Sequence, residues 1–399
     1  MEGHLPGTAG YRRVVVALFA AGVATFALLY STQAILPELA EQFGVSTAES
    51  TLSVSLTTLG LGVALLVAGP LSDVVGRTRL IHLSLTASAV VAAACALAPG
   101  WTALMVLRSL LGITLAGLPA VATAYLREEL HPSTHARAAG LYVGGTALGG
   151  MAGRLLTGAV AQAGGWRWAL AAVAALGLLC ALTVRVLLPA SRRFTAAPAG
   201  VLALLRGSLR VVSDRGLLAL YGIGGCSMGA LVAVFNTLGF RLAGAPFHLG
   251  VGAAGLMFLV YPIGSVSSVV FGRLADGYGR RTVTPLGCLL AVAGALVTLP
   301  SSLPVVVIGL ALLTAGFFAV HGVASGWVPA RAHAGGASTG QAASLYLFTY
   351  YLGSSVFGSL AGRAWTDAGW PGVVALAVLL LTATGALTLL LRRTPALGK

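Results

Sequence analysis

Long apolar runs separated by short polar stretches make up most of this chain. Twelve apolar segments can be counted, and each is near the roughly 20 residues that a helix needs to cross a lipid bilayer. The longest polar stretch between two segments, residues 189–216, is predicted to be a linker joining two six-helix halves, 1–188 and 217–399. The pattern predicts an all-α integral membrane protein with spanning helices near residues 14–36, 51–69, 80–98, 102–126, 138–161, 167–188, 217–240, 250–272, 283–300, 303–328, 340–362 and 370–391.

Composition agrees with a membrane location. The chain is 57% hydrophobic and only 9% charged, whereas soluble domains carry about 25% charged residues. The net charge of +14 would suggest a nucleic-acid partner in a soluble protein, but the Arg residues are spread over short loops, so we predict no nucleic-acid binding. The four Cys lie far apart within apolar runs and lack metal-ligand spacing. We therefore expect no metal site and no cofactor.

The distribution of Arg and Lys between alternate loops predicts the orientation in the membrane. With the N-terminus inside, 19 of the 24 Arg and Lys residues lie on the cytoplasmic side and 3 on the other side. The remaining two, Arg108 and Arg154, lie within spans. Both termini and the linker are therefore predicted to be cytoplasmic.

Two polar loops repeat the pattern Gly-x-Leu-x-Asp-x-x-Gly-Arg. Residues 69–79 read GPLSDVVGRTR and residues 272–281 read GRLADGYGRR, so Asp73 matches Asp276 at an offset of 203 residues. The second Gly permits a sharp reversal, and the Arg residues hold positive charge at the inner membrane face. The motif resembles the loop between the second and third helices of major facilitator transporters, which recurs between the eighth and ninth. This resemblance implies a major facilitator fold with 12 transmembrane helices.

Other equivalences extend the repeat along both halves. Gln33 matches Asn236 at the same offset, and Trp166 matches Trp370 at an offset of 204. Six helices per half is an even number, so the two copies share one orientation. They are therefore expected to form two bundles related by a pseudo-twofold axis along the membrane normal, with the substrate between them.

Four longer segments resemble one bacterial branch of the superfamily. They are ATFALLYSTQAILPEL (24–39), GGMAGRLLTG (149–158), AGFFAVHGVASGW (315–327) and GQAASLYLFTYYLGSS (340–355). They are similar to the acriflavine-sensitivity, YnfM-like inner-membrane transport family, over nearly the whole chain. The resemblance implies a secondary transporter of the bacterial plasma membrane that exports small molecules with proton coupling, as an antiporter.

The charged residues of the two motif loops are predicted to act in gating. In the superfamily such groups hold the halves together on the cytoplasmic side when the carrier faces outward. The alternative is a solvated loop that only sets the topology. The predicted gating residues are Asp73, Arg77, Arg79, Asp276, Arg280 and Arg281.

Polar and aromatic residues inside the spans are candidates for substrate binding. Gln33 and Asn236 occupy equivalent places on the first and seventh spans, which line the central cavity in the superfamily. Their amides suit substrate hydrogen bonds, and equally bonds between helices. Tyr30, Tyr346 and Tyr350 are expected to add an aromatic wall or, alternatively, to pack in the core; Tyr346 and Tyr350 share one helical face.

Two Arg residues lie at membrane depth, where a charge is costly and usually faces the bundle interior. Arg108 matches the Arg of an RxxxG pattern that family members use near the proton and substrate path. Arg154 is at a similar depth in the fifth span. Both are predicted to contact substrate, and the alternative is that they extend to the membrane surface.

Glycines recur in the fifth span, at positions that include Gly145, Gly149 and Gly153. This spacing of four places a bare stripe on one helix face and predicts close packing, with a hinge as the alternative. The stripe resembles the GxxxGPxxGG motif of superfamily antiporters, but Gly145 stands where that motif has Pro. Trp101, Trp166 and Trp370, at the ends of spans, are predicted to lie in interfacial belts.

Proton coupling needs a titratable group, and the predicted spans contain no Asp or Glu. His321 lies well inside the tenth span, and its unperturbed pKa near 6.5 suits the task. Hydrogen-bonded packing is the alternative role. Glu38, just after Pro37 at the outer mouth, is the next candidate.

Taken together, these features predict a monomeric, proton-coupled efflux carrier of the cell membrane. Uptake of a small organic solute is the alternative. A membrane enzyme is disfavoured because the spans hold no Ser/His/Asp cluster and no paired carboxylates, and no phosphate-binding loop argues for ATP use. A channel is disfavoured by the twofold repeat. Because Arg108 and Arg154 are the charges at depth, neutral or weakly acidic substrates are expected to be preferred over permanent cations.

Overall fold

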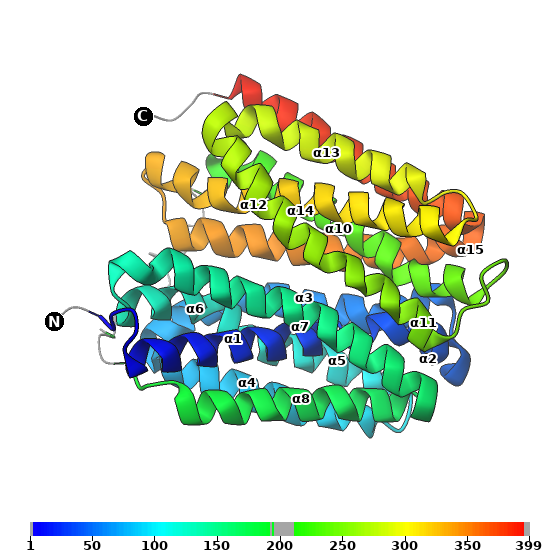
Figure 1. Cartoon of the computed structure of the whole chain (residues 1–399), viewed down its shortest axis with the longest axis horizontal. Helices are drawn as coiled ribbons and strands as arrows, with labels where there is room; N and C mark the ends of the chain where they lie inside the picture. Colours follow the sequence, from blue (N-terminus) through cyan, green and yellow to red (C-terminus); the bar gives the residue numbers. More distant parts are fainter. Residues whose placement is uncertain (1–2, 192–193, 195–210, 395–399) are drawn as a thin grey trace.

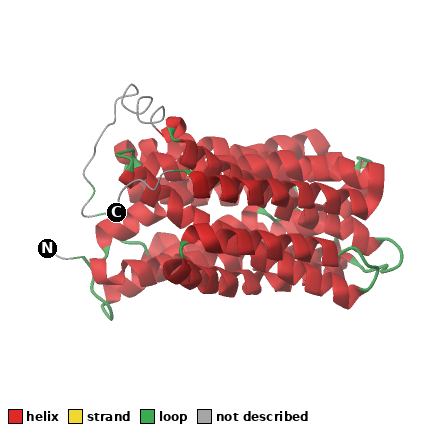
Figure 2. Cartoon of the chain, turned by 90° about the horizontal axis from the view of Figure 1, so that it is seen from above, coloured by secondary structure: helices red, strands yellow, loops and turns green. Residues whose placement is uncertain are grey.

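The structure, a computed structural model, describes residues 3–191, 194 and 211–394, and almost all of these are helical (Figures 1 and 2). Most of the predicted linker 189–216 therefore lies outside the described residues. The helices are long and lie roughly along one common direction (Figure 1). Both described ends of the chain lie at the same end of the molecule, which is also the end of the two motif loops (Figure 1). We call it the motif end, and we call the other the far end.

The first half of the chain supplies six spans, two of which are interrupted. Residues 30–35 break the first span, and a junction near Ala116 breaks the fourth. The elements are α1 (Ala9–Leu29), η1 (Gln33–Ile35), α2 (Leu36–Phe43), α3 (Thr47–Val75), α4 (Arg77–Ala96), α5 (Trp101–Leu115), α6 (Gly117–Glu129), η2 (Pro132–Thr134), α7 (His135–Gly164) and α8 (Trp166–Leu187).

The second half supplies six more spans. One of them is divided into a short helix, a 3-10 turn and a long helix. The elements are α10 (Arg215–Ala243), α11 (Val251–Gly255), η3 (Leu256–Val260), α12 (Tyr261–Tyr278), α13 (Arg280–Val297), α14 (Leu303–Ala334) and α15 (Thr339–Arg393).

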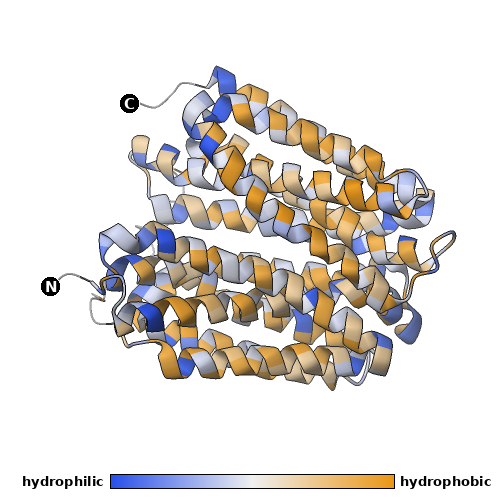
Figure 3. Ribbon diagram, viewed as in Figure 1, coloured by the Kyte–Doolittle hydropathy of each residue, from blue (hydrophilic) through white to orange (hydrophobic). Residues whose placement is uncertain are grey.

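Ten helices in the described part are long and apolar enough to cross a membrane. α7 adds a span, since it is 30 residues long although rich in Gly. α15 holds two spans, because Gly369 has non-helical backbone angles (φ 61°, ψ −152°) and divides it. Hydrophobic residues predominate along the helices, while hydrophilic residues are more frequent toward their two ends, as a membrane protein requires (Figure 3). The prediction of 12 transmembrane helices thus fits the helices observed.

The second Gly of each motif loop ends one helix and begins the next. Gly76 has φ 98° and Gly279 has φ 85°, a left-handed conformation that residues with a side chain rarely adopt. Equivalent residues of the repeat therefore make equivalent turns, α3 into α4 and α12 into α13.

The glycine stripe of α7 packs on α1, as the sequence predicts. A Cβ atom added at Gly145 would lie 2.5 Å from the carbonyl oxygen of Phe19, and one at Gly153 would lie 2.6 Å from the Cα of Ala27. In the second half, Gly353 on α15 meets the backbone of α10 at Gly225 in the same way. Small residues thus allow both pairs of helices to approach backbone to backbone.

Two Trp residues are not in the predicted interfacial belts. Trp166 is only 5% exposed and Trp370 only 6% exposed. Trp166 packs on Phe43, and the ring nitrogen of Trp370 donates to Thr298 Oγ1 at 3.1 Å. The prediction was wrong because each Trp begins a helix with its ring turned into the bundle, where it fills core space.

Specific contacts between the two halves concentrate from the middle of the molecule to the far end. Ser355 Oγ on α15 donates to the Ser55 carbonyl on α3 at 2.7 Å, and Gly252 N on α11 donates to Gln162 Oε1 on α7 at 3.3 Å. The described contacts of Asp73, Arg77 and Arg281 in the motif loops lie within their own half instead, as does the Asp214–Arg331 ion pair. Within the described residues, the halves are therefore joined away from the motif end.

Candidate functional site

Three polar side chains meet at the interface between the halves, and we call them the interface cluster: Gln33, Arg154 and Asn236. Gln33 Nε2 donates to Asn236 Oδ1 at 2.7 Å, and Arg154 Nε donates to Gln33 Oε1 at 2.6 Å. All three are nearly fully buried, with Asn236 at 0% exposure. The structure thus brings three of the predicted substrate-binding residues together, at a junction of α7, η1 and α10.

Aromatic rings surround the guanidinium of Arg154. Its carbon atom lies 4.3 Å from the ring centre of Tyr30, 4.8 Å from that of Tyr261 and 5.0 Å from that of Phe258. Tyr30 belongs to the first half, whereas Phe258 and Tyr261 come from η3 and α12 of the second. Cation–π attraction therefore joins one buried charge to both halves.

The interface cluster keeps hydrogen-bond donors unused. Asn236 Nδ2 is buried and has no partner among the described residues. Arg154 uses Nε on Gln33 and Nη1 on the Gly150 carbonyl at 2.5 Å, and Nη2 makes no hydrogen bond within the described chain. A buried donor without an acceptor is costly, so this site is suited to a ligand that brings acceptor oxygens.

Local chain geometry places Gln33 in this cluster. α1 stops at Leu29, and a turn and one 3-10 segment carry the chain to α2, which has Pro37 in its first turn. The break turns residues 30–35 across the bundle, because Pro cannot continue the preceding helical hydrogen bonds. Gln33 thereby reaches both α7 and α10.

Arg108 is fully buried and is not part of the interface cluster. Its Nε donates to the Ser53 carbonyl at 2.8 Å, and its Nη2 to the Leu29 carbonyl at 2.9 Å. Nη1 reaches Ser31 Oγ at 2.8 Å and the Leu28 carbonyl at 3.3 Å. These contacts tie α5 to α1 and α3, and they give the Leu29 carbonyl at the end of α1 a hydrogen-bond donor.

His321 and two Tyr residues form a second buried group within the second half. His321 Nδ1 and Tyr346 Oη are hydrogen bonded at 2.9 Å, and the His321 ring centre lies 4.7 Å from that of Tyr350. Phe317 stacks on His321 with an angle of 3° between the ring planes. Tyr346 and Tyr350 of the predicted aromatic wall therefore form one assembly with the predicted proton-coupling residue on α14 and α15, whereas Tyr30 lies against Arg154.

Glu38 and Arg241 occupy equivalent positions at the offset of 203, yet they carry opposite charges. Glu38 Oε1 accepts from the Trp166 N–H at 2.6 Å, at the start of α8. Arg241 donates to the carbonyls of Leu299 and Pro300 beyond the end of α13, at 3.2 and 2.9 Å. Each charge thus complements the helix end that it contacts. Glu38 keeps a second carboxylate oxygen, Oε2, that is buried and unpartnered in the described part.

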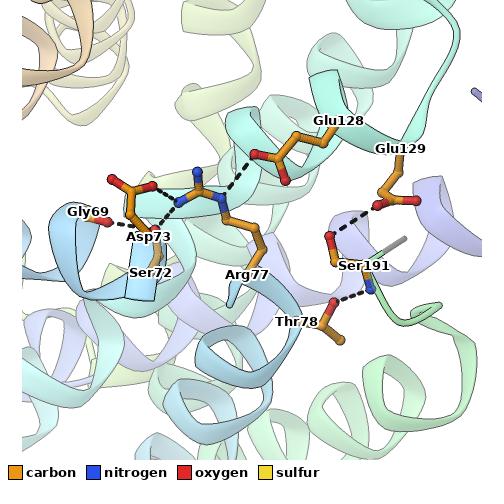
Figure 4. Close-up of polar contacts among 8 residues, drawn as sticks. All are labelled: Gly69, Ser72, Asp73, Arg77, Thr78, Glu128, Glu129 and Ser191. Carbon is orange, nitrogen blue, oxygen red and sulfur yellow. Dashed lines mark hydrogen bonds and ion pairs between the residues drawn. The ribbon is translucent and has the colours of Figure 1, made fainter. Parts of the chain in front are cut away.

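The first motif loop forms a charged cluster within its own half (Figure 4). Arg77 Nη1 lies 2.6 Å from Asp73 Oδ1, and Arg77 Nε lies 3.1 Å from Glu128 Oε1. Arg77 also contacts the hydroxyl of Ser72, which itself donates to the Gly69 carbonyl at 2.6 Å. Asp73 and Arg77 thereby link α3 and α4 to the end of α6.

The remaining predicted gating residues form no ion pair within the described chain. Arg79 and Asp276 are exposed, and Arg280 is half-buried. Arg281 donates to the carbonyls of Arg392 and Thr394 at 3.2 and 2.9 Å, which fastens α13 to the end of α15. The two motif loops are therefore not equivalent in their contacts, although their backbones turn alike.

Asp214 and Arg331 form the ion pair of the second half at the motif end. Arg331 Nε lies 2.6 Å from Asp214 Oδ1, which also accepts from the Leu217 N–H at 2.7 Å. Burial raises the pKa of the Asp214 carboxyl, but the hydrogen bonds and the charge of Arg331 outweigh it and hold this pKa below its usual value. The pair caps the start of α10 and ties it to α14.

Sequence reasoning missed four residues of these assemblies: Phe258, Tyr261, Glu128 and Arg331. Glu128 and Arg331 are equivalent positions at the offset of 203, both near the motif end. Because both copies of the repeat carry a charged residue at this position, the sequence could have indicated that these residues form ion pairs. No pattern marks Phe258 or Tyr261, because their partner Arg154 comes from the other half.

Comparison with known proteins places these features in a family. The family model of the Major Facilitator Superfamily matches residues 18–357 of this chain. The chain is 41% identical over 375 residues to the inner membrane transport protein YnfM of Escherichia coli (strain K12), covering 94% of this chain and 89% of that protein. It is 39% identical over 376 residues to the uncharacterized MFS-type transporter YybF of Bacillus subtilis (strain 168), covering 94% of this chain and 92% of that protein.

A solved structure shares the fold. A bacterial homolog of the human lysosomal transporter Spinster, in an inward-facing and occupied conformation, superposes with a TM-score of 0.77 at 15% identity, covering 97% of this chain and 98% of that chain. The chain belongs to the Major Facilitator Superfamily, and it is a multi-pass membrane transporter and not an enzyme.

Proposed function

We propose that this protein exports small neutral or weakly acidic molecules across the bacterial plasma membrane, in exchange for protons. The observation that carries the proposal is the unused donors of the interface cluster, Asn236 Nδ2 and Arg154 Nη2. Carboxylate, carbonyl and hydroxyl oxygens accept from such donors, and a charged donor strengthens the bond. A substrate with acceptor oxygens would complete the site.

The charge at this depth favours the same class of substrate. Arg154 and Arg108 are buried cations, while the described acidic side chains lie near helix ends. A cationic substrate would have to be desolvated beside Arg154 without a carboxylate to pair with it, which is costly. An anion or a neutral molecule avoids that cost, and a positive site of low dielectric attracts the anion.

The contacts between the halves support alternating access as the mechanism. Ser355 with Ser55 and Gly252 with Gln162 join the halves from the middle to the far end, while motif-end charges pair within each half. The Arg and Lys count assigns the motif end to the cytoplasm, and on this assignment the described state is closed toward the outside. Rocking of 1–188 against 217–399, with the interface cluster at the junction, would then alternate access.

For proton coupling we favour His321, because it is the His that lies well inside a described span, and its hydrogen-bond partner Tyr346 packs with Tyr350. Protonation of the imidazole would change its bond with the Tyr346 hydroxyl and add positive charge to the second half. Glu38, with its unpartnered Oε2, is the second candidate. We further propose that the carrier acts as a monomer.

Transport assays in oriented vesicles test the proposal. Inverted vesicles that contain the protein should accumulate labelled weak acids when the lumen is acidified, and dissipating the pH gradient should stop accumulation. Accumulation only in right-side-out vesicles would instead support proton-coupled uptake. Impermeant labelling of a cysteine introduced at position 200 from outside intact cells would contradict the assigned orientation.

A further inference from the structure

A cavity with basic walls lies at the motif end, on the flank of the first half. Its volume is about 440 Å³, and we call it the basic pocket. Arg79 and His82 line it from α4, and Arg185 lines it from α8. Thr78, Leu188 and Ala190 also line it, and no acidic residue is among these described lining residues.

The walls of the basic pocket are fixed by polar contacts. Thr78 Oγ1 accepts from the Ser191 N–H at 3.0 Å, and Ser191 Oγ donates to Glu129 Oε1 at 3.0 Å (Figure 4). Arg13 Nη2 donates to the carbonyl of Val186, beside Arg185, at 3.2 Å. The segment after α8 is therefore held against α4, and a third Arg lies close to the pocket.

Apolar side chains continue each wall toward the middle of the membrane. On α4, Leu83 lies one turn below Arg79 and is 64% exposed. On α8, Leu182 lies one turn below Arg185 and is 54% exposed. The basic groups at the membrane surface thus lie next to exposed apolar side chains that face the membrane interior, and we call these side chains on α4 and α8 the apolar strips.

The internal repeat shows that the arrangement of these basic groups differs between the halves. The positions equivalent to Arg79 and His82 at the offset of 203 are Thr282 and Pro285, and the position equivalent to Arg185 at the offset of 204 is Leu389. The second half instead carries Arg281 and Arg392 at the positions equivalent to Thr78 and Leu188. The combination of Arg79, His82 and Arg185 is therefore specific to the first half.

We infer that the basic pocket binds the head group of an anionic phospholipid such as phosphatidylglycerol. Clustered guanidinium groups match a phosphate diester, and the strips below Arg79 and Arg185 accommodate acyl chains. A soluble phosphate compound would use the charges but would leave the apolar strips unused. The lipid would brace α4 against α8 on the outer flank of the bundle, away from the interface cluster.

Native mass spectrometry of the purified full-length protein with phosphatidylglycerol, and with phosphatidylcholine of the same acyl chains, tests this inference. Phosphatidylglycerol should bind with higher occupancy. The double variant Arg79→Gln/Arg185→Gln should lose about fivefold in affinity per charge removed, so about 25-fold in total. The matched control Arg137→Gln/Arg215→Gln removes two exposed charges from the same end, outside the pocket, and should retain most of the binding.

Three results would overturn the inference. Unchanged phosphatidylglycerol binding in the pocket variant would exclude the site, and an equal loss in the control would indicate general surface attraction. Displacement of the lipid by an equal concentration of inorganic phosphate would indicate a phosphate site. If the double variant does not fold, as judged by its melting temperature, the single variants Arg79→Gln and Arg185→Gln are compared with the parent in the same way, and each should lose about fivefold in affinity.

Discussion

Gln33 and Asn236, which are equivalent residues of the internal repeat, are hydrogen bonded to each other at 2.7 Å across the interface between the halves. Two copies of one position can touch only near the axis that relates the halves. The bond therefore marks the pseudo-twofold axis at the level of the interface cluster. Arg154 joins the pair from one side only, through Gln33 Oε1, and gives this site its charge.

Replacing Gln33 with Ala should weaken the junction between the halves. The variant loses the bond to Asn236 and leaves Arg154 Nε without its acceptor, at a cost of about 1–3 kcal/mol. The fraction of molecules in which the two halves are closed against each other at the far end should therefore fall. Spin labels at the exposed positions Gln42 and Ala245, one in each half, should report longer distances. Unchanged distance distributions would show that the Gln33 bonds do not hold the halves together.

Replacing Asp73 with Asn should lower transport by about tenfold, with near-normal amounts of protein in the membrane. The change removes a charged acceptor of Arg77 at 2.6 Å and disturbs the cluster that includes Glu128. Asp367→Asn, an exposed acid elsewhere in the second half, is the control. If Asp73→Asn transports at the parental rate, the gating prediction is wrong, and the charges of the motif loop only set the membrane topology.

Replacing His321 with Gln should uncouple transport from the pH gradient. Gln retains hydrogen bonding to Tyr346 but carries no titratable proton, so transport should no longer respond to an imposed pH gradient. The exposed His333→Gln variant should behave like the parent. If gradient dependence persists in His321→Gln, Glu38→Gln is the next variant to measure.

The Asp214–Arg331 pair should contribute stability that depends on pH. The folded-state pKa of Asp214 lies below its unfolded value near 3.9, so the contribution is present above that value and is lost as pH falls through the folded pKa. Asp214→Asn should be less stable than the parent by about 1–3 kcal/mol at neutral pH. The difference between their free energies of unfolding should shrink below about pH 4. A difference that stays constant from pH 7 to pH 3 would exclude this linkage.

The sequence was sufficient to predict the spans and the fold, because apolar runs of membrane length allow only helices. It was also sufficient to bring Gln33 and Asn236 to equivalent places, through the offset of 203 residues. It did not predict that they bond to each other, since an offset carries no information on the distance from the repeat axis. The contacts of Phe258 and Tyr261 with Arg154 could not be predicted from the sequence either. They join the two halves, and contacts between the halves change with the conformation of the transporter.

The burial of Trp166 and Trp370 shows another limit of sequence patterns. Aromatic residues at span ends are typical of the membrane interface. Here each ring turns inward, where Trp370 stacks with Arg241 at 4.5 Å from the guanidinium carbon. The direction of a side chain at a helix start depends on the turn before it, and that turn was not predictable from hydrophobicity.

The central claim is that Arg154 makes the substrate site selective for acceptor-rich, neutral or anionic molecules. The most direct measurement compares binding of 2-naphthoate and 2-naphthylmethylamine, an anion and a cation of similar size, to the purified protein. The parent should bind the anion more tightly, by about tenfold for a single charge-assisted bond. Arg154→Gln should abolish the difference, while Arg154→Lys should retain most of it. Tighter binding of the cation, maintained when both Arg108 and Arg154 are replaced by Gln, would contradict the account.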